Sequence, residues 1–431
     1  MQGKKRFSGQ SNNSCIIGCM PVNPWVTLGI VALTFIGIAI GFYPIIKSNR
    51  TTISLMGVAL LLATSQVKFD DLPSYIDFDT IILLFSMMIL NANLKLGGFF
   101  RVTARGIIRV ARSPRTFLAV EILGAGILSA LFLNDTICLM FTPFLIGITD
   151  SLKRNPLLYL IALATASNVG SAATLTGNPQ NMIIGVASGI SYLDFLLSLA
   201  PVALLGMAVI WLVLVLLYPR EFNRDDKLLA VMDDTQEVNK PLLLKTLLVT
   251  AALLGAFLLG APVALAAFLA ASLLLITRRH QPAAVFSEFD WTLLVFFAAM
   301  FIVSGSLETS GVTTSLIDLG SLASKANVLN LTFVTAGLSN LISNVPAVML
   351  LRSVAANMPD ARLGWITIAA ASNLAGNLTL LGSVANLIVA ESAERWRIKL
   401  SFWEYTRSGM IITLITLLIA VGWLTLITIV P

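Results

Sequence analysis

Long, nearly uncharged apolar segments recur along almost the whole chain, and short polar stretches separate them. A helix that crosses a bilayer needs roughly 20 predominantly apolar residues. The pattern predicts an all-α polytopic membrane protein with about ten full transmembrane spans, two of them broken near their middle. The expected spans are 25–43, 51–65, 79–98, 157–190 (broken), 195–218, 242–259, 262–277, 290–307, 363–390 (broken) and 408–429.

Two further apolar stretches, 117–149 and 328–355, are interrupted midway by polar residues. Each is too long for one span, and each suits a re-entrant hairpin that enters and leaves on the same side. Non-helical backbone at membrane depth is tolerated only where it is buried in protein or lines a water-filled cavity. The polar tips of the two hairpins therefore predict a cavity.

The two halves of the chain repeat. SALFLNDTICLM (129–140) is similar to SNLISNVPAVML (339–350), and SNVGSAATLTGNPQNMII (167–184) is similar to SNLAGNLTLLGSVANLIV (372–389). Each half holds five spans, an odd number, so the second copy is predicted to be inverted, as in many transporters with a midplane site. The expected organisation is an N-terminal tail (1–24), a first inverted repeat (25–219), a cytoplasmic linker (220–240) and a second inverted repeat (241–431).

Composition excludes a soluble domain. Apolar residues make up 57% of the chain and charged residues only 12%, against roughly a quarter charged in soluble proteins. The net charge of +6 comes from Lys and Arg in short loops, which is a topology signal and no sign of nucleic-acid binding. The positively charged loops are 44–50, 99–116, 151–156, 219–245, 278–289 and 395–407.

If these loops share the cytoplasmic face of a bacterial inner membrane, both termini are extracytoplasmic. The segment 101–115 carries five arginines and no acid, and it predicts an amphipathic helix at the inner interface.

The cysteines Cys15, Cys19 and Cys138 form neither a disulfide framework nor a thiolate metal cluster, and the single histidine, His280, lies in a loop. No Gly-rich phosphate loop ending in Lys-Ser/Thr is present, which argues against ATP hydrolysis by this chain. We expect no metal, no cofactor, no nucleic acid and no enzymatic activity, since no nucleophile–base pair is visible. The expected partners are a small solute or ion and membrane lipid; the sequence leaves open an ATPase on a separate chain.

The polar clusters at the two hairpin tips and the two breaks are the predicted binding site. Unwound helices offer free N–H and C=O groups and the partial charges of half-helix ends. Alternatively, such residues only join helices through hydrogen bonds, but four clusters in equivalent positions favour a site. The candidate binding residues are Asn134, Asp135, Thr136, Asn168, Thr174, Thr176, Gly177, Asn178, Asn181, Ser343, Asn344, Asn373, Asn377, Thr379, Gly382, Ser383 and Asn386.

Asp135 is the candidate proton carrier, because an ionisable side chain inside a membrane marks ion or proton pathways. The alternative is a permanently ionised aspartate that caps a hairpin helix. Lys95 is expected to extend toward the interface. Glu121 lies near the base of the first hairpin, and Cys138 is expected to be a packed core residue.

The motifs NDT, ASNVGSAATLTGNPQN, SNVP and NLTLLGSVANLIV resemble those of the ion transporter superfamily of arsenite permeases and divalent-anion symporters. Within it, the chain is most similar to silicon (silicic acid) efflux transporters of the plant type and their bacterial relatives, from residue 25 to the C-terminus. The resemblance implies inverted repeats with re-entrant hairpins, a homodimer formed by a scaffold part, and a mobile part that carries the substrate. In the symporter branch, paired Ser-Asn-Thr tips bind sodium. Here the tips are Asn134-Asp135-Thr136 and Ser343-Asn344-Val345, so an acid is present and the second threonine is lost.

We therefore expect a secondary transporter that couples protons to the efflux of a small neutral metalloid hydroxide, silicic acid or arsenite. The predicted site offers amides and hydroxyls but no Arg or Lys, which suits a neutral solute. A helix N-terminus can also hold an anion without a basic side chain, so a sodium- or proton-coupled di- or tricarboxylate symporter is the first alternative. A passive channel is the second.

Overall fold

The computed structural model describes residues 23–40, 49–110, 113–222, 238–276, 282–311 and 327–429. Within these ranges all regular secondary structure is helical, which confirms the all-α class. Cys15, Cys19, His280 and most of the expected linker (223–237) lie outside the described residues.

Six helices of the described part are long and apolar enough to cross a membrane. They are α4 (Phe78–Gly97), α6 (Pro114–Leu131), α10 (Tyr192–Leu217), α12 (Lys240–Leu258), α15 (Trp291–Thr309) and α22 (Phe402–Ile429).

Three of the expected spans are shorter helices: α1 (Pro24–Ile40), α2 (Arg50–Ala63) and α13 (Val263–Leu275). At 1.5 Å per residue the 14 residues of α2 extend only about 21 Å, short of the roughly 30 Å hydrocarbon core.

Both expected hairpins are present. The first consists of α6 and α7 (Asn134–Ser151), and the second of α18 (Val328–Ile342) and α19 (Asn344–Ala356). Both expected broken spans are present as well. The first consists of α8 (Pro156–Ser171) and α9 (Pro179–Ser188), and the second of α20 (Ala361–Ala375), η2 (Leu380–Gly382) and α21 (Val384–Glu394).

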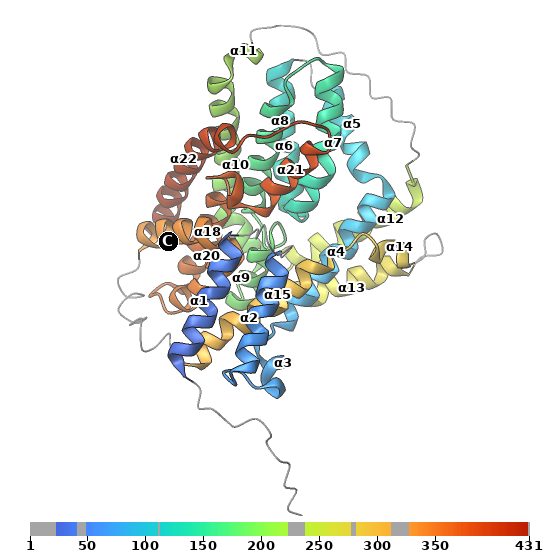
Figure 1. Ribbon diagram of the computed structural model, residues 1–431. Coiled ribbons are helices and arrows are strands. Elements are labelled where there is room, and N and C mark those ends of the chain that lie inside the picture. The colour runs from blue at the N-terminus through green and yellow to red at the C-terminus, as the bar shows by residue number, and fades with distance from the viewer. Residues whose placement is uncertain are drawn as a thin grey trace, which may run out of the picture.

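The two halves interlock around the breaks (Figure 1). Within each half, the first arm of the hairpin packs on the broken helix: α6 on α8, and α18 on α20. The second arm crosses to the other half, since α7 packs on α21 and α19 packs on α9. Each hairpin tip is therefore placed beside both breaks.

The arginine-rich segment forms a shorter helix than expected, α5 (Phe99–Val110). It buries Phe100, Ala104 and Ile107 against the protein and exposes Arg109, as an amphipathic helix does. The helix ends before residue 115 because Ser113 caps the next helix and Pro114 begins it.

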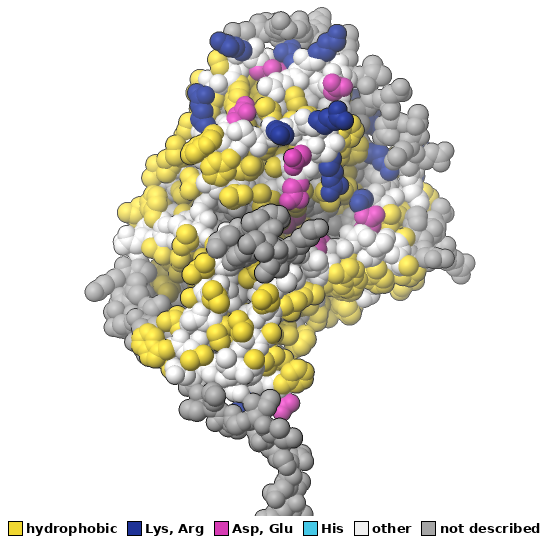
Figure 2. All heavy atoms as spheres, viewed as in Figure 1, with side chains coloured by type: hydrophobic (Ala, Val, Ile, Leu, Met, Phe, Trp, Pro, Cys, Tyr) yellow, Lys and Arg dark blue, Asp and Glu magenta, His cyan; other side chains and the backbone are white. Residues whose placement is uncertain are grey.

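Short helices complete the described part; they are η1 (Phe69–Asp71), α3 (Leu72–Tyr75), α11 (Pro219–Phe222) and α14 (Pro282–Phe286). Large apolar side chains are exposed over much of the surface; Leu259, Ile276 and Trp403 are 90%, 75% and 77% exposed. Figure 2 shows this apolar surface, with Lys and Arg gathered toward the end of the molecule that carries α11. Exposed apolar area on this scale fits a multi-pass protein in contact with lipid.

Candidate functional site

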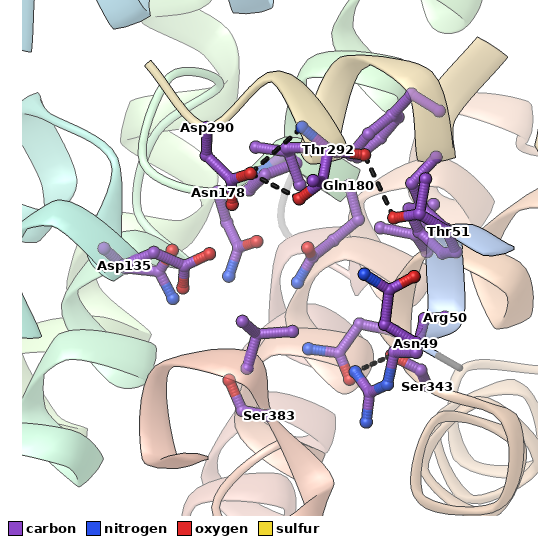
Figure 3. A pocket seen from close by; sticks show the side chains of 18 of the residues that line it. Asn49, Arg50, Thr51, Asp135, Asn178, Gln180, Asp290, Thr292, Ser343 and Ser383 are labelled. Atoms are coloured by element: carbon purple, nitrogen blue, oxygen red, sulfur yellow. Dashed lines mark hydrogen bonds between the residues drawn. The ribbon is translucent and has the colours of Figure 1, made fainter. Parts of the chain in front are cut away.

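A cavity of about 380 Å³ lies where the hairpin tips and the breaks meet (Figure 3). The first tip contributes Asn134 and Asp135, and the second contributes Ser343 and Asn344. The breaks contribute two further groups of polar residues, namely Asn178 and Gln180 from the first and Ser383 from the second. The structure therefore brings all four predicted clusters to one cavity.

Local sequence explains the first break. Asn178 has an extended backbone (φ −148°), and Pro179 then begins α9 with its fixed φ and missing N–H. Gly177 is needed because a Cβ there would lie 2.5 Å from the Ser171 carbonyl oxygen. The Gly177 carbonyl accepts a 3.1 Å hydrogen bond from the backbone N–H of Asn134, which fixes the hairpin tip to the break.

Two asparagines hold the breaks in equivalent ways. The side-chain amide of Asn181 donates to the carbonyls of Ser171 (3.0 Å) and Thr174 (2.8 Å). Its counterpart Asn386 donates to the carbonyls of Gly376 (2.8 Å) and Thr379 (3.1 Å). Each asparagine thus satisfies carbonyls that the interruption of the helix leaves without a backbone partner.

A second pair of asparagines joins the halves. Asn373 donates a 2.7 Å hydrogen bond to Asn181 Oδ1, and Asn168 donates a 3.0 Å hydrogen bond to Asn386 Oδ1. All four side chains are fully buried, and their amide groups are occupied by protein partners. These four predicted site residues therefore hold the site in shape and do not face the cavity.

Other predicted site residues also bond to protein. Thr174 donates to the Ala130 carbonyl, and Thr176 lies 3.4 Å from the Tyr192 hydroxyl. Asn377 accepts from Asn168 (2.9 Å) and donates to a backbone carbonyl of α8. Thr379, Gly382 and Thr136 also lie outside the lining of this cavity.

Several polar groups in the cavity have no protein partner among the described residues. The Asn178 amide has none, and neither does the buried Asn134 Oδ1. Gln180 donates to Asn373 (3.2 Å) through its Nε2 atom, which leaves its oxygen for another partner. Together with the Asp135 carboxyl group, these atoms can replace the hydration of a small polar solute.

The expectation that the site holds no basic residue is wrong. Arg50, the first residue of α2, lines the cavity, and its guanidinium lies 3.5 Å from Ser343 Oγ. Figure 3 shows it across the cavity from Asp135. The charge pattern predicts Arg50 in a cytoplasmic loop, whereas the structure places it in the first turn of α2, in the lining of the cavity.

Sequence reasoning also missed two acids. Asp290 precedes α15, where it accepts a 3.1 Å hydrogen bond from the Thr292 backbone N–H, and Glu391 lies on α21; both line the cavity. Asp290 follows a polar loop and caps a helix, so nothing local distinguishes it from an ordinary capping residue. With Asp135, the cavity holds three carboxyl groups and one guanidinium.

Ser343 has a strained backbone at the second tip. Its φ of 81° and ψ of 160° belong to a region that is essentially restricted to glycine. Such strain costs about 1–3 kcal/mol and persists only where the surrounding structure enforces it. It points to a functional constraint on this tip.

Three further residues that the sequence singled out have definite places. Lys95 forms an ion pair with Glu288. Glu121 is 1% exposed on α6, and neither of its carboxylate oxygens has a partner among the described residues. Cys138 is fully buried in the core.

Comparison with known proteins identifies the family. The model of the CitMHS family, described as "Citrate transporter", matches residues 33–365, which is well over half of the chain. The chain belongs to this transporter family. An uncharacterized transporter of Mycobacterium tuberculosis is 30% identical, covering 92% of this chain and 98% of its own.

Two other relatives have more specific names. A silicon efflux transporter of Oryza sativa is 29% identical, covering 92% of this chain and 97% of its own. A putative transporter, arsB, of Dictyostelium discoideum is 24% identical, with 86% of each chain covered. The protein is thus a secondary transporter of the ion transporter superfamily, as its motifs predicted. Its relatives are named as transporters and not as enzymes.

Solved transporters share the fold. The YdaH transporter of Alcanivorax borkumensis aligns over 95% of this chain and 98% of its own, with a TM-score of 0.54 and 17% identity. MtrF of Neisseria gonorrhoeae aligns over 94% of each chain, with a TM-score of 0.56 and 9% identity. At these low sequence identities, the similarity shows that the folds are alike and nothing about the substrate.

Proposed function

We propose that this transporter couples proton movement to the efflux of a small neutral metalloid hydroxide, silicic acid or arsenite. The observation that supports this most directly is the set of polar groups on Asn178, Asn134 and Asp135 in the central cavity, which have no hydrogen-bond partner within the described part of the chain. A neutral hydroxide both donates and accepts hydrogen bonds, so amide and carboxyl groups can satisfy it from several sides.

The charge of the cavity supports a neutral solute. Asp135, Asp290 and Glu391 outnumber Arg50 three to one. A free tricarboxylate would bring further negative charge toward these acids, and like charges at close range disfavour binding. The cavity volume of about 380 Å³ is ample for a small hydroxide, and the name of the Oryza sativa relative points to the same class of solute.

Asp135 serves as the proton carrier in this proposal. It lies at the tip of α7, beside both breaks, where movement of the hairpin can expose it to either side. A carboxyl group that takes up a proton on one side and releases it on the other links proton entry to solute exit. Arg50 lies across the cavity from Asp135 (Figure 3). Its role in this proposal is to donate hydrogen bonds to the solute.

Arg50 also supports a second candidate, a cation-coupled symporter of di- or tricarboxylates. Its guanidinium has the planar fork that matches a carboxylate, and the family description names citrate. In this case the cavity acids hold the coupling cation.

Transport in proteoliposomes separates the two candidates. Silicic acid, arsenite and citrate are each presented under an imposed pH gradient and, separately, under a sodium gradient. The proposal expects accumulation of silicic acid or arsenite driven by the pH gradient alone. Accumulation of citrate with neither hydroxide moving would contradict it and support the symporter. Flux that never exceeds equilibration under any gradient would indicate a passive channel.

A further inference from the structure

A second, smaller cavity of about 160 Å³ adjoins the solute cavity. It lies between α4 and the first hairpin, and both cavities are bordered by Asp135, Asp290, Leu293 and Val384. Its volume has room for several water molecules, since a water occupies roughly 30 Å³ in the liquid. Asp135 thus stands in the wall between two cavities.

Polar groups continue from Asp135 to the mouth of the smaller cavity. Asn91, on α4, is 4% exposed and donates a 3.4 Å hydrogen bond to Thr136 Oγ1, while its own Oδ1 has no partner among the residues that the structure describes. The ion pair of Lys95 and Glu288 lies further along the same lining, with side chains 37% and 27% exposed. A buried, unpartnered amide oxygen between a carboxyl group and a solvent-exposed ion pair is the setting in which ordered water is found.

We propose that the coupling proton reaches Asp135 through this smaller cavity, past Asn91, and not through the solute cavity. The proposal rests on the carrier role of Asp135. Separate entrances let the proton and the solute reach the hairpin tip from different directions, so a bound solute does not block protonation. The Lys95–Glu288 pair forms the entrance of the proton route.

The charged residues around Asp135 are consistent with separate routes for the proton and the solute. The charged residues that line the two cavities, besides Asp135 itself, are Arg50, Lys95, Glu288, Asp290 and Glu391. Among the helices packed on α7, α8 carries no charged residue, and the charged residues of α5 and α6 line neither cavity. Asn91 is therefore the buried polar group on the α4 side through which water can approach the carboxyl group.

Thiol labelling tests the cavity independently of any substrate. On a background without native cysteines, Ala92→Cys places a thiol in the lining of the smaller cavity, and Ala125→Cys places one at a fully buried position that lines neither cavity. A small anionic methanethiosulfonate should modify the first several-fold faster than the second. Glu288→Gln, which breaks the ion pair at the entrance, should increase the rate further. Equal labelling of both thiols would overturn the proposal.

A transport measurement tests the route. Asn91→Leu places an apolar side chain in the path of the proton. Both the rate of silicic acid transport driven by a pH gradient and the accompanying pH change inside the liposomes should fall by about tenfold or more, because a positioned proton-transfer path is lost. Silicic acid counterflow without a pH gradient should stay within twofold. The matched control is Asn93→Leu on the same helix, since Asn93 bonds to the Ile89 carbonyl (2.8 Å) and lines neither cavity.

The two failures are distinguishable. If Asp135→Asn abolishes pH-driven transport and Asn91→Leu behaves like Asn93→Leu, the proposed proton route is wrong, and Asp135 is still supported as the proton carrier. If Asp135→Asn retains pH-driven transport, the carrier itself is wrong, and the thiol rates alone then decide whether the cavity holds water.

Discussion

Asn373 donates a 2.7 Å hydrogen bond to the side-chain oxygen of Asn181, across the boundary between the two halves of the chain. The equivalent bond in the opposite direction joins Asn168 to Asn386 at 3.0 Å. Each break is thus held by its own asparagine and connected to an asparagine of the other half. The geometry of the solute cavity depends on both halves at once.

Substitution of either break asparagine should destabilise the protein to a similar extent. Asn181→Asp sets a carboxylate against the Ser171 and Thr174 carbonyls, and Asn386→Asp does the same against Gly376 and Thr379. Buried groups left without partners cost about 1–3 kcal/mol each, so both variants should lose at least that much stability and all transport. Thermal unfolding in detergent and uptake measure these effects.

The control for this pair is Asn330→Asp, an exposed position near the start of α18 where a negative charge is tolerated. It should unfold like the unsubstituted protein. Normal stability of both break variants would show that the network does not hold the breaks.

Asp135→Asn should separate solute movement from proton movement. The amide keeps the size and hydrogen bonding of the side chain but cannot release a proton. We expect silicic acid or arsenite to exchange across the membrane at a rate near that of the unsubstituted protein, without accumulation under a pH gradient. Undiminished pH-driven accumulation would rule out Asp135 as the proton carrier and leave it as a negative charge in the first turn of α7.

Arg50 distinguishes a neutral solute from an anion. In either case Arg50→Gln removes a hydrogen bond from a charged group, worth about 1.5–3 kcal/mol, and should raise KM by roughly tenfold or more. If the solute is a neutral hydroxide, Arg50→Lys should restore much of the loss, because an ammonium also donates hydrogen bonds; if it is a carboxylate, Arg50→Lys should not restore it, because lysine lacks the planar fork. Concentration dependence of uptake for silicic acid and citrate reads out the difference.

Ser343 offers a test of strain at the second tip. Ser343→Gly should stabilise the protein by about 1 kcal/mol, because glycine adopts a positive φ without steric cost. Ser343→Ala retains the strain and removes only the hydroxyl group near Arg50, so its stability should not increase. The comparison of unfolding temperatures for the two variants is the measurement. If both are equally stable, the tip is not strained.

Much of the architecture was predictable because its signals are local. Gly177 and Pro179 break the helix between α8 and α9 regardless of how the surrounding helices pack. The polar tips at Asn134 and Asn344 are visible in the sequence because they interrupt apolar stretches. The candidate site was harder to predict in detail. The sequence made both Asn181 and Asn178 candidate binding residues, yet the side-chain amide of Asn181 donates to backbone carbonyls and only Asn178 lines the cavity.

By itself, the sequence determined that this is an all-helical membrane transporter with two hairpins and two breaks, because hydrophobicity, proline and glycine act over a few residues. Only the tertiary structure decided which polar groups are free and which charges meet. Arg50 and Asp290 lie far apart in the chain and neither was a candidate site residue, but the packing of α2 on α15 brings both to the cavity. Hydrogen bonding and charge depend on distances in space, and the spacing of residues along the chain does not specify those distances.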